Sequence, residues 1–174
     1  MKSKKHYISI AFGTVFIFSL LIFFAAQSKL DGSTVESREL KLSKLSKINR
    51  NAHICYEINI DDYIVSGYIS SNNTYGLAIF VPVGNGKYRL QSNCLRENNE
   101  LIHDSVIVNQ KNYDLFWANK ANLDYAEITY TVSNRAQETL KLDATDNKII
   151  YYKAPSNDYS IEYVFVGANG NRYK

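Results

Sequence analysis

Several residue types and spacings are scarce or missing in this chain of 174 residues, and each absence excludes a class of site. The two cysteines and three histidines include no close Cys pair and no close His pair, the local spacing that zinc sites usually show. Residues 82–89 (PVGNGKYR) lack the full Gly-x-x-x-x-Gly-Lys-Ser/Thr spacing of a phosphate-binding loop, and strand patterns flank them. We therefore predict neither a metal ion nor a cofactor.

A recognisable catalytic arrangement is also missing. Carboxylates are available at Glu57, at the adjacent Asp61 and Asp62, and at Glu100, but any domain of this size contains such acids. No Ser-His-Asp or Glu-Glu arrangement follows from their spacing. We predict a protein that is not an enzyme. The alternative is a small hydrolase of cell-wall polysaccharide, with carboxylates from different strands in one cleft.

The sequence has no clustered basic face of the kind that nucleic-acid binding requires. The formal net charge is +3, but residues 52–174 hold 11 Lys and Arg against 14 Asp and Glu, a balance of −3. The basic excess lies in residues 1–51, outside the strand patterns. We therefore predict that nucleic acid is not a partner.

Charge is absent from the apolar run at residues 8–26. A helix of this length spans about 28 Å, close to the ~30 Å hydrocarbon core of a bilayer. Three lysines precede the run closely, and this local charge favours a cytoplasmic N-terminus. We predict a cytoplasmic n-region at residues 1–7, a transmembrane anchor or signal peptide at 8–28 that contacts membrane lipid, and the rest of the chain outside the cell.

Retention or cleavage of residues 8–28 decides between a single-pass cell-membrane protein and a secreted one. The run is longer than the about 7 to 15 apolar residues of a typical signal peptide, which favours a retained anchor. Ala26 and Ser28 are small residues at the two positions that a signal peptidase reads, which favours cleavage. We predict a retained anchor, with secretion after cleavage as the alternative.

Residues 29–51 are basic, with six Lys and Arg against three acids. Within them Leu42, Leu45 and Ile48 recur every three residues with lysines between them, a helix-like stripe that suits anionic headgroups. A solvated stalk that joins the anchor to the following domain is the simpler interpretation. We predict the stalk.

From residue 52 onward the apolar period changes to two, the period of a half-buried strand. Turn sequences such as GNGK (residues 84–87) and GANGN (167–171) separate the runs. No helical pattern is long enough to connect parallel strands, so about ten strands should pair antiparallel. We predict an all-β domain at residues 52–174, an extracytoplasmic antiparallel β-sandwich. The alternating runs begin at Ile54, Tyr75, Tyr113, Ala126 and Tyr159.

The end of this domain, from YAEITYTVSN (residues 125–134) to DYSIEYVFVGANGNRY (158–173), resembles bacterial immunoglobulin-like domains in its short-strand spacing. The resemblance implies an immunoglobulin-like sandwich in which the run from Tyr159 is strand F.

Tyrosine is abundant, with 14 in the chain. Most tyrosines fall on the apolar phase of a strand, where we expect them to be buried or half-buried. An excess on one outer face would instead form a platform for a sugar or a peptide. We predict a non-catalytic binding or interaction module whose partner is a protein or a cell-wall component.

The two cysteines, Cys55 and Cys94, lie in the predicted extracytoplasmic domain. An oxidising compartment favours a disulfide between them, which on the loop-closure model removes about 4 kcal/mol of unfolded-state entropy. Cys55 falls on the polar phase of its strand and Cys94 on the apolar phase. We predict the disulfide, with two free thiols as the alternative.

Overall fold

The computed structural model describes residues 31–45, 51–70, 73–97, 99–133, 135–136 and 139–174. The predicted n-region (1–7) and the predicted anchor or signal peptide (8–28) lie outside these residues. Within the described part, no helix is both long enough and apolar enough to cross a bilayer.

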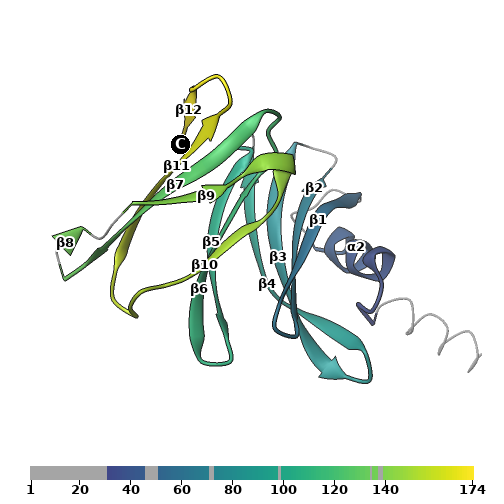
Figure 1. Cartoon of the computed structure of the whole chain (residues 1–174). Helices are drawn as coiled ribbons and strands as arrows, with labels where there is room; N and C mark the ends of the chain where they lie inside the picture. The colour runs from purple at the N-terminus through teal and green to yellow at the C-terminus, as the bar shows by residue number, and fades with distance from the viewer. Residues whose placement is uncertain (1–30, 46–50, 71–72, 98, 134, 137–138) are drawn as a thin grey trace, which may run out of the picture.

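The described residues form three antiparallel sheets, which confirms the predicted all-β, antiparallel class (Figure 1). Sheet A is a meander of β1 (Ala52–Ile60), β2 (Tyr63–Ser70), β3 (Thr74–Gly84) and β4 (Lys87–Glu97). Sheet B has the order β10 (Ile150–Lys153), β6 (Lys111–Ala118) and β5 (Leu101–Val108). Sheet C has β12 (Arg172–Tyr173), β11 (Ser160–Gly167) and β7 (Leu123–Val132), and β7 also pairs with β8 (Arg135–Ala136) and β9 (Leu140–Asp143).

Sheet B is the middle layer, because both of its faces are covered. One face packs on sheet A through side chains such as Leu115 and Trp117, and the opposite face packs on sheet C through Phe116 and Ala118. A strand between two apolar layers loses the polar half of its alternation, and β6 is accordingly buried from Asp114 to Ala118. Gly67 of sheet A allows the close approach, since a Cβ atom there would lie 2.5 Å from the Trp117 ring.

This layering refines the predicted sandwich. Face-to-face packing of antiparallel sheets agrees with it, whereas the third sheet was not predicted. The sequential order of sheet A also differs from the ABED and CFG sheets of an immunoglobulin domain, so the immunoglobulin-like topology is not observed. Turns form as predicted at Asn85-Gly86, between β3 and β4, and at residues 168–171, between β11 and β12.

Helix α2 (Val35–Ser43) covers the outer face of sheet A. It begins with a capping box in which the Ser37 amide donates to Thr34 Oγ1 and the Thr34 amide donates to Ser37 Oγ, both at 3.2 Å. Leu42 is fully buried against the sheet and Leu45 packs beside it. Residues 31–45 therefore belong to the domain, so this part of the predicted stalk (29–51) is not a solvated linker.

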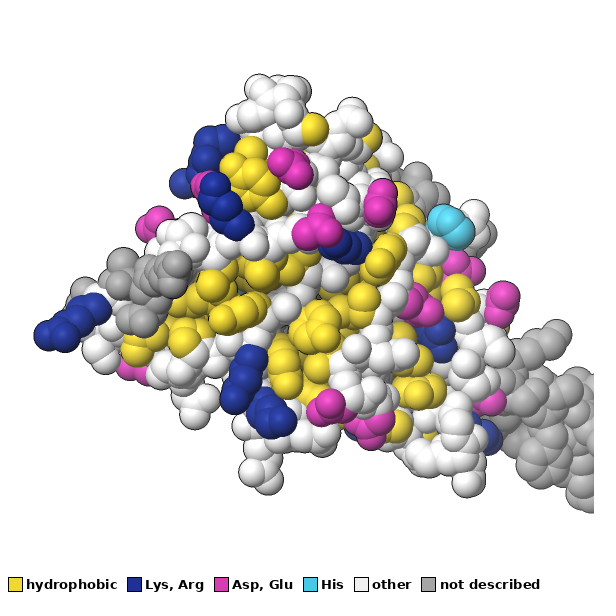
Figure 2. All heavy atoms as spheres, in the orientation of Figure 1, with side chains coloured by type: hydrophobic (Ala, Val, Ile, Leu, Met, Phe, Trp, Pro, Cys, Tyr) yellow, Lys and Arg dark blue, Asp and Glu magenta, His cyan; other side chains and the backbone are white. Residues whose placement is uncertain are grey.

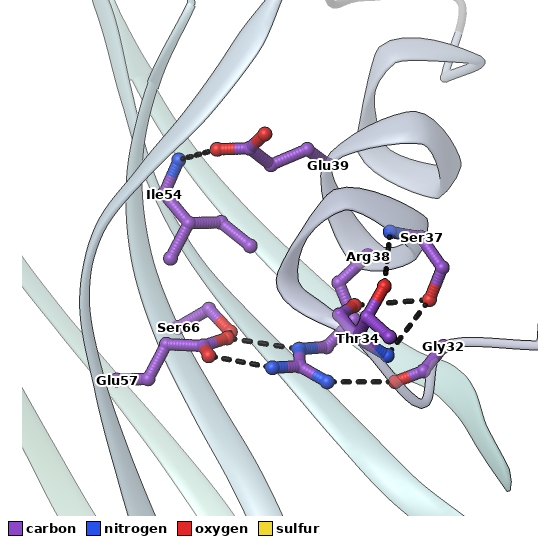
Figure 3. A network of polar contacts seen from close by, with 8 residues as sticks. All are labelled: Gly32, Thr34, Ser37, Arg38, Glu39, Ile54, Glu57 and Ser66. Carbon is purple, nitrogen blue, oxygen red and sulfur yellow. Dashed lines mark hydrogen bonds and ion pairs between the residues drawn. The ribbon is translucent and has the colours of Figure 1, made fainter.

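A two-pronged ion pair fixes α2 to the sheet (Figure 3). Arg38 Nε and Nη2 donate to the two carboxylate oxygens of Glu57 on β1, at 2.9 and 2.6 Å. Arg38 Nη1 donates to the Gly32 carbonyl at 2.7 Å, and the Ser66 hydroxyl donates to Glu57. Every nitrogen of the buried guanidinium thus has an acceptor, which burial of a charged group requires.

The same helix closes the outer edge of β1. Glu39 Oε1 accepts the Ile54 amide at 2.8 Å, as Figure 3 shows, and Ser43 Oγ accepts the Ala52 amide at 3.0 Å. Unpaired edge amides are a template for pairing with another chain, so these two side chains protect the edge.

A β-bulge at Cys55 changes the face on which the apolar side chains of β1 lie. Before the bulge, Ala52 and Ile54 pack toward α2, and after it Tyr56 and Ile60 pack toward sheet B. The alternation predicted from Ile54 onward is confirmed as a strand, but it serves two different layers.

Candidate binding cleft

A cleft of about 540 Å³ opens where one end of each sheet comes together. Sheet A contributes Tyr75 of β3, sheet B contributes Glu100 and Leu101 at the start of β5 and Lys120 after β6, and sheet C contributes Tyr173 of β12. Asn73, Asn99, Arg172 and Lys174 complete the walls. The volume lies within the range of about 300 to 1,000 Å³ that is usual for small-ligand sites.

Lys120 is held in the cleft by two neighbours. Its ammonium lies 3.5 Å from Glu100 Oε2 and 4.4 Å from the centre of the Tyr173 ring. The ring face and the carboxylate both stabilise the cation, so the ammonium is positioned with about a third of the side chain (32%) still open to solvent.

Tyr75 shares the same carboxylate. Burial raises the pKa of Tyr75, and Glu100 raises it further through its charge and through the hydrogen bond that it accepts from the hydroxyl. The Tyr75 hydroxyl therefore stays protonated and remains a hydrogen-bond donor in the cleft. Its ring and that of Tyr173 give the cleft two aromatic surfaces.

The basic side chains of the cleft outnumber the acidic ones. Lys120, Arg172 and Lys174 line it, against the carboxylate of Glu100 among the described side chains. Figure 2 shows basic side chains gathered with acidic ones at the end of the molecule where Figure 1 labels β12, whereas the middle of that face is apolar. The lining thus carries more cations than carboxylates, although Lys120 and Arg172 each pair with an acid, Glu100 and Glu127.

A second, smaller groove of about 160 Å³ adjoins the cleft on sheet C and shares Arg172 and Lys174. It contains two carboxylates, Glu127 of β7 and Glu162 of β11, on the same face of the sheet. Arg172 hydrogen-bonds to Glu127 and, with a smaller effect from Lys141, holds the pKa of that carboxyl below its usual value. A glycosidase acid needs a raised pKa, so Glu127 is suited to binding Arg172 and not to proton donation.

The carboxylates weighed in the sequence do not gather in one cleft. Glu57 pairs with Arg38 under α2, and Asp61 in the β1–β2 turn accepts a hydrogen bond from the Asn109 amide at 2.9 Å. Of the four acids considered in the sequence, Glu100 alone lines the cleft. Lys120, Arg172 and Tyr173 were not predicted, because Lys120 follows β6 whereas Arg172 and Tyr173 form β12, and no local spacing connects the two places.

The predicted disulfide between Cys55 and Cys94 is not formed, and both thiols are free. Cys55 lies on β1 and Cys94 on β4, the two edge strands of sheet A, with β2 and β3 between them. Three strand spacings amount to about 14 Å, whereas bridged Cα atoms lie within about 7 Å. Burial raises the pKa of both thiols.

A buried carboxyl at Asp114 was also missed. Its oxygens accept hydrogen bonds from Tyr130 Oη at 2.9 Å and from Tyr159 Oη at 2.8 and 2.9 Å, and His103 Nε2 lies 3.0 Å away. Asp114 is on β6 and Tyr130 on β7, so the cluster joins sheet B to sheet C. The available signal was an acid inside the apolar run YDLFWA, since unpaired charged residues are rarely buried.

His53 and His103 contact different carboxylates. His103 contacts Asp114, and His53 Nδ1 lies 3.1 Å from Glu39 Oε1 on the exposed side of β1. Among the residues that the structure describes, no three or more His, Cys, Asp or Glu side chains are grouped to hold a metal ion.

Comparisons with known proteins give no family assignment for this arrangement. No protein-family model matches the chain, and no significant match is found among curated proteins or solved structures.

Proposed function

We propose that the chain is an extracytoplasmic, membrane-anchored binding module whose three-sheet cleft holds an acidic saccharide without cleaving it. The observation that carries this proposal is the composition of the cleft, which combines two tyrosine rings with a basic charge balance. The predicted anchor at residues 8–28, with its uncharged apolar run, supports the location.

Each part of the cleft matches a part of such a ligand. The flat rings of Tyr75 and Tyr173 suit the apolar faces of pyranose rings, and the amides of Asn73 and Asn99 suit hydroxyl groups. Lys120 and Lys174 provide cations for a carboxylate or phosphate substituent. A neutral saccharide would use the rings and amides alone, and Lys120 would keep Glu100 as its anion.

Calorimetric titration of the full-length protein in detergent micelles tests the ligand class. We expect short oligogalacturonates to bind and neutral galactose oligomers of the same length to bind far more weakly. Lys120→Gln should weaken binding by roughly tenfold, the effect of one lost charge-assisted hydrogen bond. Added salt should weaken binding as well, because the contacts are partly solvent-exposed.

The matched control is Lys111→Gln, which removes the same charge from the β5–β6 turn, at the opposite end of sheet B from the cleft. Equal loss of affinity in the two variants would mean that net charge and not the cleft attracts the ligand. Shortened oligosaccharides in the recovered sample would show cleavage, which would contradict the binding module and support the hydrolase alternative.

The location is tested separately through Cys55, which is exposed on β1. In a Cys94→Ser background, a membrane-impermeant maleimide added to intact cells should label Cys55, slowly because the raised pKa leaves little thiolate. The labelled protein should stay with the membranes after a carbonate wash. Labelling that requires permeabilised cells would overturn the outside location, and release of the protein into the medium would indicate cleavage.

A further inference from the structure

The domain begins very close to the predicted membrane segment. The Asp31 carbonyl accepts the Tyr88 amide of β4 at 2.7 Å, and the Lys41 ammonium donates to the Tyr88 carbonyl. Residue 31 is therefore fixed to the edge of sheet A. Three Cα steps separate it from residue 28, the end of the predicted anchor, and they span at most about 11 Å.

The element beside this entry point is the β3–β4 hairpin, at the lower right of Figure 1. Val83 near its tip is an exposed aliphatic side chain, with 56% of its surface open to solvent. Lys87 and Arg89 on the returning strand are exposed as well. After the hydrogen bonds from Ser33, the charges of Lys87 and Lys41 lower the pKa of Asp31, so both lysines lie near the point where the chain enters the domain.

We infer that the β3–β4 hairpin rests on the outer surface of the bilayer, with Val83 in the interface and Lys87 and Arg89 against anionic headgroups. An apolar tip with flanking basic residues is the combination that interfacial segments use. The inference rests on the retained anchor of the proposed function, because only a retained anchor holds the hairpin within reach of lipid.

This contact would also orient the binding cleft. Strand β3 runs from Thr74, next to the cleft residue Asn73, to Gly84 in the hairpin. At about 3.3 Å per residue its two ends are about 33 Å apart. Figure 1 accordingly places the hairpin and the β12 end of the molecule at opposite extremes. A hairpin on the membrane therefore directs the cleft away from it, toward soluble or wall-bound ligands.

A fluorescent probe at Val83 tests the contact in the full-length chain. With Cys55 and Cys94 replaced by serine, Val83→Cys carries an environment-sensitive dye and the protein is reconstituted into phosphatidylcholine vesicles that contain a quarter phosphatidylglycerol. We expect a blue-shifted emission that spin-labelled lipids quench. Ala168→Cys is the matched control, because Ala168 is also exposed but lies in the β11–β12 turn, at the opposite end of the molecule.

Removing the two basic charges tests the hairpin contact, and vesicle flotation tests the anchor separately. A Lys87→Gln, Arg89→Gln pair in the Val83→Cys protein should reduce the quenching, as should vesicles of phosphatidylcholine alone. Equal emission and quenching at positions 83 and 168 in protein that floats with the vesicles would overturn the hairpin contact and leave the anchor intact. Protein that fails to float with the vesicles would overturn the hairpin contact and the anchor together.

Discussion

Two acids on different strands fasten the layers of this domain, and they are neutralised in different ways. Glu57 faces α2 and pairs with the guanidinium of Arg38, with 20% of its side chain exposed. Asp114 lies between sheets B and C with 1% exposed, and its main donors are the hydroxyls of Tyr130 and Tyr159. The helix contact is thus a charge pair near the surface, whereas the sheet contact is a hydrogen-bond cluster in the core.

The difference predicts how each contact fails. Water can reach Glu57 when Arg38 is lost, and this hydration reduces the free-energy cost of the unpaired charge. Water cannot easily reach Asp114. A tyrosine hydroxyl that loses this acceptor therefore lowers the stability by its full desolvation penalty. We therefore expect the sheet B–sheet C contact to determine global stability and the α2 contact to open locally.

Asp114→Ala should give the largest effect. It leaves the buried Tyr130 hydroxyl without its acceptor and creates a cavity, which together should cost about 3 to 5 kcal/mol of unfolding free energy. Urea denaturation measures the change. Tyr159→Phe is the control within the same cluster and should cost about 1 kcal/mol, because one donor is removed and the other remains. A cost below that of Tyr159→Phe would show that Asp114 does not hold the two sheets together.

Arg38→Met should have a smaller effect, about 2 to 3 kcal/mol, because Glu57 loses its partner but is partly solvated. The double variant Arg38→Met, Glu57→Gln should regain at least half of the lost unfolding free energy, since a neutral amide no longer requires a cation. Hydrogen exchange of the α2 amides should increase more than that of β6. Uniform exchange over both elements would contradict the local opening.

Alkaline pH should weaken the tyrosine cluster by a small amount. Burial raises the pKa of Tyr159 to about 12, with Asp114 adding to the effect, whereas the unfolded side chain titrates near its ordinary value of about 10. The folded state keeps the proton longer, so this stabilisation is present below about pH 10 and is lost as the pH rises toward about 12. Thermal melts across this window should show a steeper decline for the parent than for Tyr159→Phe. Identical declines would mean that another group controls alkaline unfolding.

The strands of this fold were largely predictable, whereas their layering was not. Period-two alternation marks β1, β3, β6, β7 and β11 because each has an apolar face. The bulge at Cys55 moves Ile54 and Tyr56 to opposite faces without interrupting the pattern, so no alternation reveals which layer a residue enters. The disulfide prediction failed for a related reason, since spacing along the chain does not place Cys55 and Cys94 at opposite edges of one sheet.

The apolar stripe at Leu42 and Leu45 was visible in the sequence, but the predicted solvated stalk gave it no partner in the domain. Leu42 and Leu45 do form an apolar stripe, but sheet A covers it and lipid headgroups or solvent do not. The cleft could not be predicted from the sequence. Its lining comes from the ends of three sheets, and local spacing does not show which strand ends lie side by side.

The middle sheet imposes an order on assembly. Its third strand, β10, comes after β7, β8 and β9 of sheet C, and the chain then returns to sheet C for β11 and β12. A chain that emerges from its N-terminal end can complete the sheet A meander early, but the edge of β6 has no neighbour until residues 150–153 arrive. The final closing of the core is therefore delayed until nearly the whole polypeptide has been delivered, and a truncation before Ile150 would leave a strand edge open to other chains.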